Sequence, residues 1–307
     1  MSTRDRATLA AYRVGWSAVR RLPERAAYLL FDQVADVVWR RRGAGVRQLE
    51  ANLARVRPQL DDAGLRRLTR AGMRSYLRYW CDAFRLPDWD ERRIVESVRA
   101  FGVEPVRECL ESGRGVVMFL GHLGNWDHAG AWSALQLAAP TTVAERLRPE
   151  QLFDQFVAFR ERLGMTIVPL GGNGVFRQLM SALRGGGFVP LLADRDLTDG
   201  GVEVSFFGEP ARMAVGPAAL ALQTGAALHP VGIHYERRGK GWGIVITWHP
   251  EVPAPQRVSR GAAATREAVG AMTQACADVL AGDIDRHPQD WHMLQRMFTA
   301  DLGSARR

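Results

Sequence analysis

The sequence predicts an α/β fold in which a single sheet is covered by helices on both faces and follows a helical N-terminal portion. Residues 1 to about 100 show the 3.6-residue apolar spacing of helices, whereas from about residue 114 short β-rich runs alternate with helical spacers. That alternation is typical of a sheet covered by helices. The 307 residues are 47% hydrophobic and contain no internal repeat or long linker, so we expect one domain, residues 1–307, with its α/β core in residues 101–307.

Three helices are expected in the N-terminal portion. Their segments are AAYLLFDQVADVVWRRR (26–42), VRQLEANLARV (46–56) and LRRLTRAGMRSYLRYWCDAFRL (65–86), with breaks at Pro58 and Pro87. The first segment gathers five apolar residues near one helical face: Tyr28, Phe31, Ala35, Val38 and Trp39. We interpret this face as interfacial, and a helix packed against the core with its arginines in solvent explains the spacing equally well.

The net charge of +8 is concentrated in the first 60 residues, where twelve arginines and five acidic residues leave +7. Such a basic arm suits nucleic acid or an anionic membrane surface. Because the apolar face accompanies the charge and ends in Arg40, Arg41 and Arg42, the membrane surface is favoured and no nucleic-acid partner is expected. No segment approaches the roughly 20 apolar residues that cross a bilayer, and no secretory signal is recognised. We therefore expect peripheral, monotopic binding at the cytoplasmic face of the cell membrane.

Seven β-rich runs make up the expected sheet. They are GVVMFL (115–120), TTVAER (141–146), MTIVPL (165–170), FVPLLA (188–193), VEVSFF (202–207), ALHPVGIHY (227–235) and GIVITWH (243–249). Helical spacers separate several of them, notably QLFDQFVAFRERL (151–163) and NGVFRQLMSALRGG (173–186). The closing HPQDWHMLQRMF (287–298) is expected to be an aromatic helix that packs onto the core.

A candidate catalytic histidine follows the first β-rich run. His122 comes directly after GVVMFL and Gly121, at the carboxyl end of a predicted strand, where open α/β sheets usually place their sites. Gly121 and Gly124 allow a sharp turn and keep side chains away from an incoming substrate. A structural histidine is the alternative, and the position at a strand end between glycines favours function.

Asp127 is the predicted partner of this histidine. Asn125 is expected to cap a helix that begins at Trp126, which puts Asp127 in the first turn, able to fold back toward the imidazole of His122. An aspartate so placed fixes the tautomer of the ring and stabilises the imidazolium that forms when the ring takes a proton. The pair is therefore interpreted as a general base.

Two other chemistries are disfavoured. The chain has no G-x-S-x-G, so a serine hydrolase lacks its nucleophile. A zinc site needs a third ligand, and His122, Asp127 and His128 do not share a helical face. Cys81, Cys109 and Cys276 are far apart and match no metal or redox spacing, so we expect unpaired thiols, a reducing compartment and no metal. What remains is a base that activates the hydroxyl of a substrate.

Further polar residues are weaker candidates for substrate binding. Glu145 ends a predicted strand, and Glu203 interrupts an apolar run, where a carboxylate is costly unless it is paired. Both could bind sugar hydroxyls or brace His122. Asp194 and Arg195 follow the run 188–193 together with Asp196, again at a strand end, and an ion pair among the three is the structural alternative. His229, His234, His249, His287 and His292 have no acidic residue at a comparable spacing and are interpreted as structural or exposed.

Several segments together resemble one enzyme family. HLGNWD resembles the H-x4-D motif of glycerolipid acyltransferases, and its surroundings resemble the branch that contains the lipid A late acyltransferases and the actinobacterial phosphatidylinositol mannoside acyltransferases. The segments with counterparts in that branch are NLARVRP (52–58), SYLRYWCDAFRLP (75–87), GHLGNWD (121–127), residues 191–233, and HPQDWHMLQRMF (287–298). DRDL and GVEVSFFGEPARM are most similar to the mannoside acyltransferases, and the arginine-rich composition fits a GC-rich actinobacterium.

The resemblance implies a membrane-associated acyltransferase with a glycerolipid acyltransferase-like fold. It implies transfer of a long acyl chain, typically palmitoyl, from acyl-CoA as co-substrate to the 6-hydroxyl of a mannose of phosphatidylinositol mannoside, with no further cofactor. His122 would then be the base supported by Asp127, and no acyl-enzyme would form. Arg160 matches an arginine of the family that would hold a phosphate of donor or acceptor, and a surface salt bridge is the alternative.

Other functions remain open at this point. The acceptor could be a lysophospholipid or a lipid A-like disaccharide, and the donor an acyl carrier protein. A non-catalytic lipid-binding protein on the same scaffold is an alternative from another class, against which the intact His122 and Asp127 count.

Overall fold

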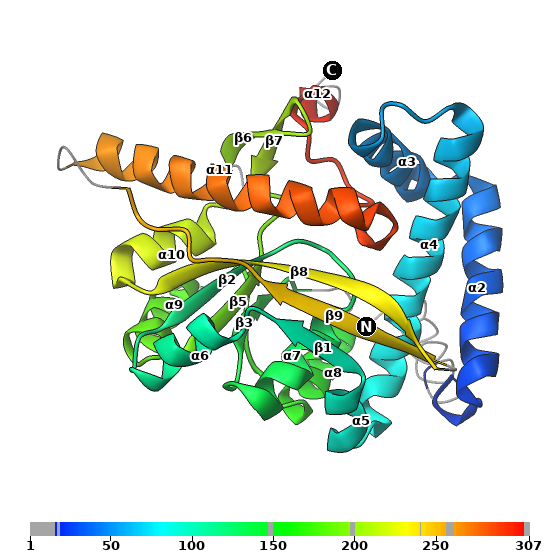
Figure 1. The fold of residues 1–307 in the computed structure, drawn as a ribbon, viewed down its shortest axis with the longest axis horizontal. Helices are drawn as coiled ribbons and strands as arrows, with labels where there is room; N and C mark the ends of the chain where they lie inside the picture. Colours follow the sequence, from blue (N-terminus) through cyan, green and yellow to red (C-terminus); the bar gives the residue numbers. More distant parts are fainter. Residues whose placement is uncertain are drawn as a thin grey trace.

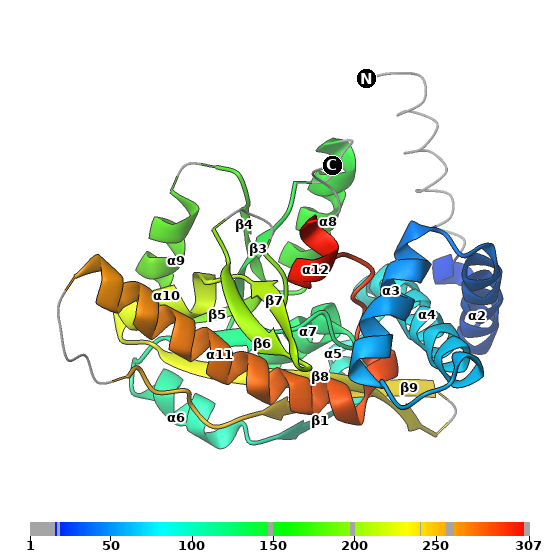
Figure 2. The same cartoon turned by 90° about the horizontal axis from the view of Figure 1, so that it is seen from above.

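The computed structural model describes residues 16, 19–146, 150–172, 174–196, 200–239, 241–255 and 261–303. Its N-terminal part is helical, as expected: α2 (Glu24–Arg41), α3 (Ala44–Val56) and α4 (Asp62–Arg85) pack side by side at one end of the sheet (Figures 1 and 2). Asp61 caps α4 by accepting a hydrogen bond of 2.7 Å from the amide of Gly64. The part of the predicted basic arm before residue 16 lies outside the described residues.

The apolar face predicted for residues 26–42 lies against the protein. Ala35 is fully buried with Val38 and Trp39 beside it, and Tyr28 and Phe31 pack around Ala27 and Cys81. The interfacial reading of this face is therefore wrong, and the alternative of a core-packed helix is confirmed. Asp36, on the same helix, is buried between Arg70 and Arg74 of α4, whose hydrogen bonds lower the pKa of its carboxyl.

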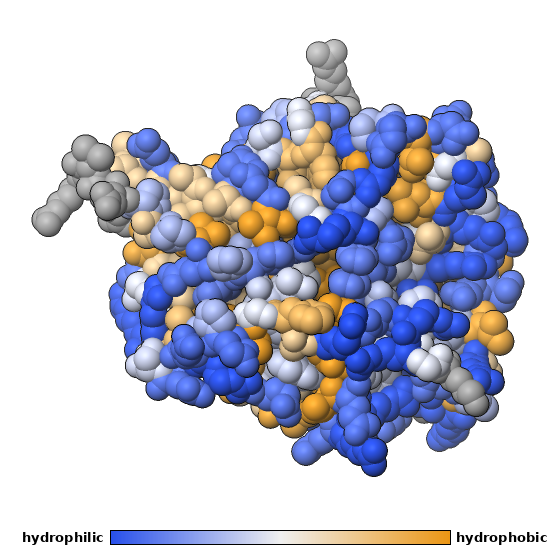
Figure 3. Space-filling view, in the orientation of Figure 1, coloured by the Kyte–Doolittle hydropathy of each residue, from blue (hydrophilic) through white to orange (hydrophobic). Residues whose placement is uncertain are grey.

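A second apolar stripe on α2 is exposed. It consists of Leu29, Leu30, Val34 and Val37, whose exposed fractions are 63%, 46%, 41% and 42%. Apolar atoms reach the surface at the right-hand edge of Figure 3, where α2 runs. Arg40 and Arg41 in the last turn are exposed, whereas Arg42 pairs with Glu50 at 2.7 Å. None of the described helices is long and apolar enough to cross a membrane.

The central sheet has five strands in the order β1-β9-β8-β2-β5. Their bounds are β1 Val98–Phe101, β2 Val116–Leu120, β5 Phe188–Leu192, β8 Ala227–Arg238 and β9 Gly241–Trp248. All neighbours are parallel except β8 and β9. The sequence predicted every strand of this sheet except β1. Since β2 is buried along its whole length, its continuous apolar run is that of a central parallel strand.

The prediction of a single sheet is corrected by two further strand pairs. β3 (Thr141–Ala144) and β4 (Thr166–Pro169) form a parallel pair, and β6 (Val202–Phe206) and β7 (Glu209–Met213) form an antiparallel hairpin. One bridge, Pro140 to Phe188, and a bond of 2.6 Å from the Thr142 hydroxyl to the Pro190 carbonyl join β3 to the edge of β5. Because that carbonyl faces β3, the missing N–H of Pro190 also faces β3, and a regular ladder cannot continue there.

Helices cover both faces of the central sheet, as predicted. α10 (Gly216–Thr224) and α11 (Ala262–Arg286) lie above it in Figure 1, and α6 (Glu104–Glu111) and α7 (Trp126–Gln136) lie beneath. Further helices of the described part of the chain are α5 (Glu91–Glu96), α8 (Glu150–Arg162), α9 (Val175–Arg184), α12 (Thr299–Leu302) and the 3₁₀ turns η1 (Leu86–Asp88) and η2 (Pro288–Asp290).

The closing segment is not the helix that the sequence predicted. After η2, residues 291–298 follow an irregular path in which Trp291 and Phe298 are fully buried. The aromatic residues therefore pack onto the core as expected, but the backbone does not form the hydrogen bonds of a helix. Its amides and carbonyls bind other elements, including the carbonyl of His122, which accepts a hydrogen bond of 2.8 Å from the amide of His292.

Candidate active site

A cavity of about 550 Å³ lies next to the end of β2. Its wall is mostly apolar and comes from β2, β3, β5, β8, β9 and helices α7 to α10. The lining follows β2 from Leu120 to Met118 and α7 from Trp126 to Ser133. A mostly apolar cavity with a few polar groups is typical of a small-molecule site. Its polar lining residues include His122, Asp127, Glu145, Arg160, Arg195 and Asp196.

The carboxylate that binds the His122 ring belongs to Asp194. Nδ1 of His122 lies 2.6 Å from Oδ1 of Asp194, and the amide of His122 donates to Oδ2 at 2.9 Å. Trp291 donates its indole N–H to the same Oδ2 at 3.0 Å. Asp194 is fully buried, which alone would raise the pKa of its carboxyl, but the charge and hydrogen bonds of His122 lower that pKa below its usual value. The carboxylate is therefore held ionised.

Strand register explains this pairing. β2 and β5 are parallel neighbours with Leu120 opposite Leu192, so His122 and Asp194 each follow the last paired residue by two positions. An ionised carboxylate only accepts hydrogen bonds, so Nδ1 of His122 carries a proton, and in the neutral ring Nε2 presents a lone pair. His122 lines the cavity, and within the described residues no protein group hydrogen-bonds Nε2. This nitrogen is therefore available as a base.

Asp127 has other partners than the predicted one. It accepts from the hydroxyl of Tyr79 at 2.8 Å and from Nε and Nη2 of Arg160 at 2.7 and 3.3 Å. Burial lowers the pKa of Arg160, yet the Asp127 carboxylate raises it more, so the pKa lies above its usual value. The structure thus corrects the predicted contact between Asp127 and the imidazole, while a catalytic role of Asp127 stays a prediction.

A ring stack links the Asp127 ion pair to His122. The rings of Tyr79 and Trp126 lie 4.1 Å apart between centroids, and the ring of Trp126 meets that of His122 edge-on at 5.6 Å. Holding Tyr79 in place therefore holds Trp126 against the imidazole. Asp127 is thus linked to the imidazole only indirectly, through these two aromatic rings.

The loop between β2 and α7 follows the predicted helix start. Asn125 caps α7 by accepting from the amide of His128 at 3.0 Å, and the helix begins at Trp126. Gly124 has a φ of +55°, and a Cβ there would lie 2.9 Å from the carbonyl oxygen of Ile233. A Cβ on Gly121 would lie 2.9 Å from Leu280 and 3.3 Å from the Asp194 carboxylate. Both glycines thus permit close packing of the loop, rather than the predicted clearance for a substrate.

The closing segment fixes this loop from the other side. The carbonyl of Asp290 accepts from the amide of Gly124 at 2.9 Å, and Leu123 and Trp291 form an isolated β-bridge. Sequence reasoning missed the roles of Tyr79 and Trp291. Tyr79 carried no local signal beyond its place in a matched segment, and Trp291 was recognised only as an aromatic residue for packing.

Arg195 is another of the predicted polar residues that line the cavity. Its Nη2 lies 3.4 Å from the exposed carboxylate of Glu145, and both residues line the cavity. Its buried Nε has no hydrogen-bond partner in the described part of the chain. Asp196 turns elsewhere, toward the amide of Gly201 at 2.7 Å. The suggested ion pair among residues 194–196 is therefore not formed.

Glu203 lies away from the cavity. It is on the exposed face of the β6–β7 hairpin, with its carboxylate 3.3 Å from the Thr299 hydroxyl, and does not belong to the residues that line the cavity. The expectation of a costly buried carboxylate is corrected, because a two-stranded hairpin leaves one face in solvent. Arg160, by contrast, is partly buried in the cavity wall, where its guanidinium is already engaged by Asp127.

A carboxylate-oriented histidine beside an apolar cavity is suited to an enzyme that activates a hydroxyl next to a lipid-like ligand. Comparison with known proteins gives the particular class. The chain belongs to the bacterial lipid A biosynthesis acyltransferase family, whose model matches residues 2–300. It is an acyltransferase by this membership.

Curated relatives cover nearly the whole chain. A phosphatidylinositol mannoside acyltransferase of Mycobacterium tuberculosis (strain CDC 1551 / Oshkosh) is 44% identical over 301 residues, 97% of this chain and 90% of that protein. The phosphatidylinositol mannoside acyltransferase of Mycolicibacterium smegmatis (strain ATCC 700084 / mc(2)155) is 43% identical over 300 residues, 96% of this chain and 93% of that protein. These comparisons confirm the resemblance drawn from the motifs.

Proposed function

We propose that this acyltransferase moves a long acyl chain, palmitoyl in the first instance, from acyl-CoA to the 6-hydroxyl of a mannose of phosphatidylinositol mannoside. The relatives of 44% and 43% identity support the acceptor, because both carry phosphatidylinositol mannoside in their names. The observation that carries the proposal is the His122–Asp194 pair at a mostly apolar cavity. An acyl chain fits the cavity by polarity, and its thioester would then lie beside His122.

The chemistry is a direct transfer. Nε2 of His122 takes the proton of the sugar hydroxyl as its oxygen attacks the thioester carbonyl, and the carbon–sulfur bond breaks when the tetrahedral intermediate collapses. The imidazolium then returns the proton to the departing thiolate of coenzyme A. Asp194 stabilises the imidazolium through Nδ1 and keeps the ring in the required tautomer. No acyl-enzyme is formed along this route.

Arg195 is the donor that we assign to the developing oxyanion. The amides of residues 122 to 124 are already bound, to Asp194, to the Gly121 carbonyl at 2.7 Å and to the Asp290 carbonyl at 2.9 Å. The Arg195 side chain lines the cavity, and its Nε lacks a partner within the described residues. A preorganised charged donor of this kind stabilises the transition state more than the ground state.

We place α2 at the membrane. Its exposed apolar stripe, defined above as Leu29, Leu30, Val34 and Val37, lies on the helix that ends in Arg40 and Arg41. An amphipathic surface with arginines suits an anionic lipid surface at the cytoplasmic face. An acceptor anchored in the bilayer by its fatty chains could then present its sugar to His122.

The proposal is tested with purified protein, labelled palmitoyl-CoA and a panel of acceptors. We expect transfer to phosphatidylinositol mannoside, with the new ester on a mannose 6-hydroxyl by mass spectrometry and NMR, and loss of transfer in His122→Ala. Preferred transfer to a lysophospholipid or a lipid A-like disaccharide would overturn the acceptor. A requirement for acyl carrier protein instead of coenzyme A would overturn the donor.

The use of the cavity is tested at Ser133. This residue lines the cavity and follows Trp126 by seven positions on α7, so it lies about 10 Å further along that helix than Trp126. Ser133→Leu fills that part, and we expect palmitoyl transfer to fall by roughly tenfold or more while octanoyl transfer is kept. Ser133→Ala is the matched control and should retain palmitoyl transfer. Equal losses with both chain lengths in Ser133→Leu would mean that the acyl chain lies elsewhere.

A further inference from the structure

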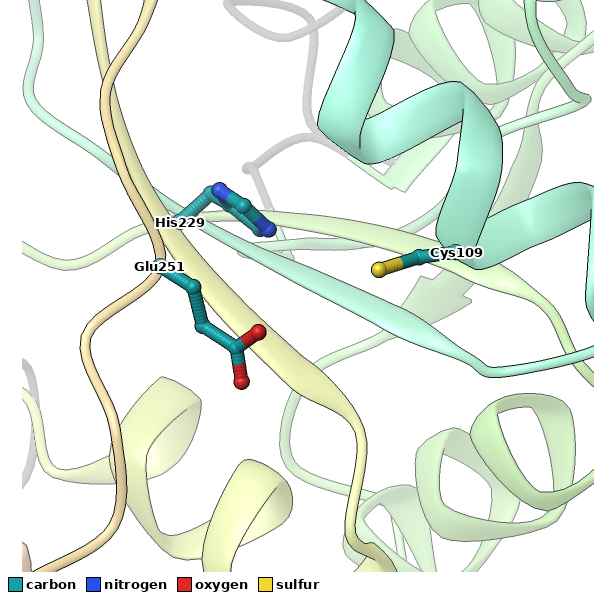
Figure 4. Close-up of side chains that lie close together, drawn as sticks. All are labelled: Cys109, His229 and Glu251. Carbon is teal, nitrogen blue, oxygen red and sulfur yellow. The ribbon is translucent and has the colours of Figure 1, made fainter.

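Three side chains that are far apart in the sequence meet near the start of β8. Cys109 comes from α6, His229 from the beginning of β8 and Glu251 from the segment after β9 (Figure 4). The thiol sulfur, one ring nitrogen and one carboxylate oxygen all lie within 4.8 Å of one another. None of the three residues lines the cavity beside His122. The cluster is therefore separate from the acyl-transfer site.

The His229 ring nitrogen that faces the cluster has no hydrogen-bond partner. Nδ1 of His229 lies 2.9 Å from the carbonyl oxygen of His249, which only accepts, so Nδ1 carries the proton and Nε2 the lone pair. The residue is only 2% exposed, and its buried Nε2 is unpaired among the residues that the structure describes. A buried acceptor without a hydrogen bond costs free energy, and a ligand bound to this nitrogen would offset that cost.

The backbone holds two of the ligands in place before any ion binds. The segment after β9 runs along the start of β8, with a hydrogen bond of 3.0 Å from the amide of His249 to the Pro230 carbonyl and one of 2.8 Å from Val252 to Leu228. These bonds flank His229 and Glu251. The bond from Nδ1 to a backbone carbonyl also fixes the orientation of the imidazole, as it does for many metal-binding histidines.

We propose that Cys109, His229 and Glu251 bind one zinc ion, with water as the fourth ligand. Thiolate, imidazole and carboxylate are the ligands that zinc takes in proteins, whereas magnesium and calcium require sets of oxygen ligands. The thiolate and carboxylate neutralise the charge of the ion. In an assembled tetrahedral site the ligand atoms lie about 3.3 to 3.8 Å apart, so the separations of up to 4.8 Å have to shorten by up to about 1.5 Å.

Arg114 supports the carboxylate ligand. Its Nη1 and Nη2 donate to the two oxygens of Glu251 at 2.9 and 2.6 Å. Each carboxylate oxygen has two lone pairs, so one oxygen can bind the ion while both remain bound to the guanidinium. Glu251 is 32% exposed and Cys109 is partly exposed, which leaves the ion a path from solvent. Once bound, the ion would tie α6 to the sheet and stabilise the fold.

The binding test uses full-length protein without a histidine tag. After equilibrium dialysis against zinc and metal analysis, we expect about one zinc per chain in the wild type and its loss in Cys109→Ser and in Glu251→Gln. Cys276→Ala removes a buried thiol outside the cluster and is the matched control, which should keep the zinc. Zinc retained by Cys109→Ser but lost on replacing the stacked pair His234 and His287 would overturn the proposal.

Two further measurements use only the wild-type protein, so their outcome does not depend on how well a variant folds. Cobalt(II) added to wild-type protein should give a thiolate-to-cobalt charge-transfer band, and its absence would contradict a thiolate ligand. Cys81 and Cys276 are buried, so labelling of the native protein with a thiol reagent reports on Cys109. We expect zinc to slow this labelling at least tenfold, and we expect the effect to saturate at one equivalent of zinc. Unchanged labelling in the presence of zinc would also overturn the proposal.

Discussion

Replacing Asp194 by asparagine should disable the base without removing the loop that carries it. Oδ2 of Asp194 accepts two hydrogen bonds, from the His122 amide and the Trp291 indole, and Oδ1 faces Nδ1 of His122. Asparagine has one oxygen, which these two N–H donors hold in the Oδ2 position. Its NH₂ group then faces Nδ1 and donates to it. The imidazole is forced into the tautomer with its proton on Nε2, which can no longer accept a proton from the substrate.

The expected loss is that of a general base. Rotating the amide to restore the original tautomer would turn its NH₂ group toward two N–H donors. This rotation would cost about 1 to 3 kcal/mol of free energy for each group left without a hydrogen bond. The wrong tautomer therefore predominates. We expect kcat/KM for acyl transfer to fall by about 10² to 10⁴, which corresponds to roughly 3 to 5.5 kcal/mol of transition-state stabilisation. The Tm should stay close to that of the wild type, because both bonds to the Oδ2 position are kept.

Asp127→Asn provides the contrast, measured by initial rates with labelled acyl-CoA and by thermal melts. It breaks the buried pair with Arg160, so we expect destabilisation by about 3 to 5 kcal/mol and a smaller loss of rate per folded molecule. The opposite pattern would refute the reasoning: near-normal kcat/KM in Asp194→Asn, with activity abolished and Tm unchanged in Asp127→Asn. Asp127 would then be the partner of the base in the working enzyme.

Three further outcomes are expected. Acyl-CoA supplied without acceptor should leave the intact mass of the protein unchanged, and stoichiometric acylation of a serine or cysteine would contradict direct transfer. Anionic vesicles should co-sediment more protein than neutral vesicles, and high salt should reduce the difference. The double variant Leu30→Ser/Val34→Ser, or glutamine at both Arg40 and Arg41, should reduce binding to anionic vesicles without changing the Tm. Equal binding in all of these experiments would exclude α2 as the docking surface. Burial lowers the pKa of His128 to about 4 from the usual 6.5, so the stability contributed by its neutral ring is full above pH 6.5 and is lost as the pH falls toward 4. Urea melts of His128→Gln should therefore show a pH slope in that window flatter by up to about 1.4 kcal/mol per pH unit, and an unchanged slope would contradict the shift.

Local patterns predicted most of the secondary structure. The buried run of β2, the cap at Asn125 and the helix from Trp126 were all read correctly, because a strand run and an N-cap are properties of neighbouring residues. The closing residues 287–298 were misread for a related reason. Their apolar content indicated packing onto the core, but the hydrogen bonds that hold the backbone of Trp291 and His292 out of a helix come from the loop at His122, which lies far away in the sequence.

The same distinction applies to the surface of α2. The apolar residues at helical spacing belonged to the core, and the exposed stripe around Leu30 and Val34 is the second apolar set on a helix with two such faces. Spacing identifies a face but not the element that covers it. Only the positions of α3 and α4 decide which face remains for solvent or lipid.

By itself, the sequence determined the site-prone strand end, the histidine in its glycine-flanked turn and the resemblance to an acyltransferase family. The tertiary structure alone decided that the carboxylate at Nδ1 of His122 is Asp194 and that Asp127 belongs to a buried pair with Arg160. It also brought Cys109, His229 and Glu251 together. The physical reason is strand order: β2 pairs in parallel with β5, and two residues that follow their strands by the same number of positions meet at one edge, although 72 positions separate them in the chain. Spacing within one loop cannot reveal such a pair, because sheet neighbours are chosen by packing across the whole core.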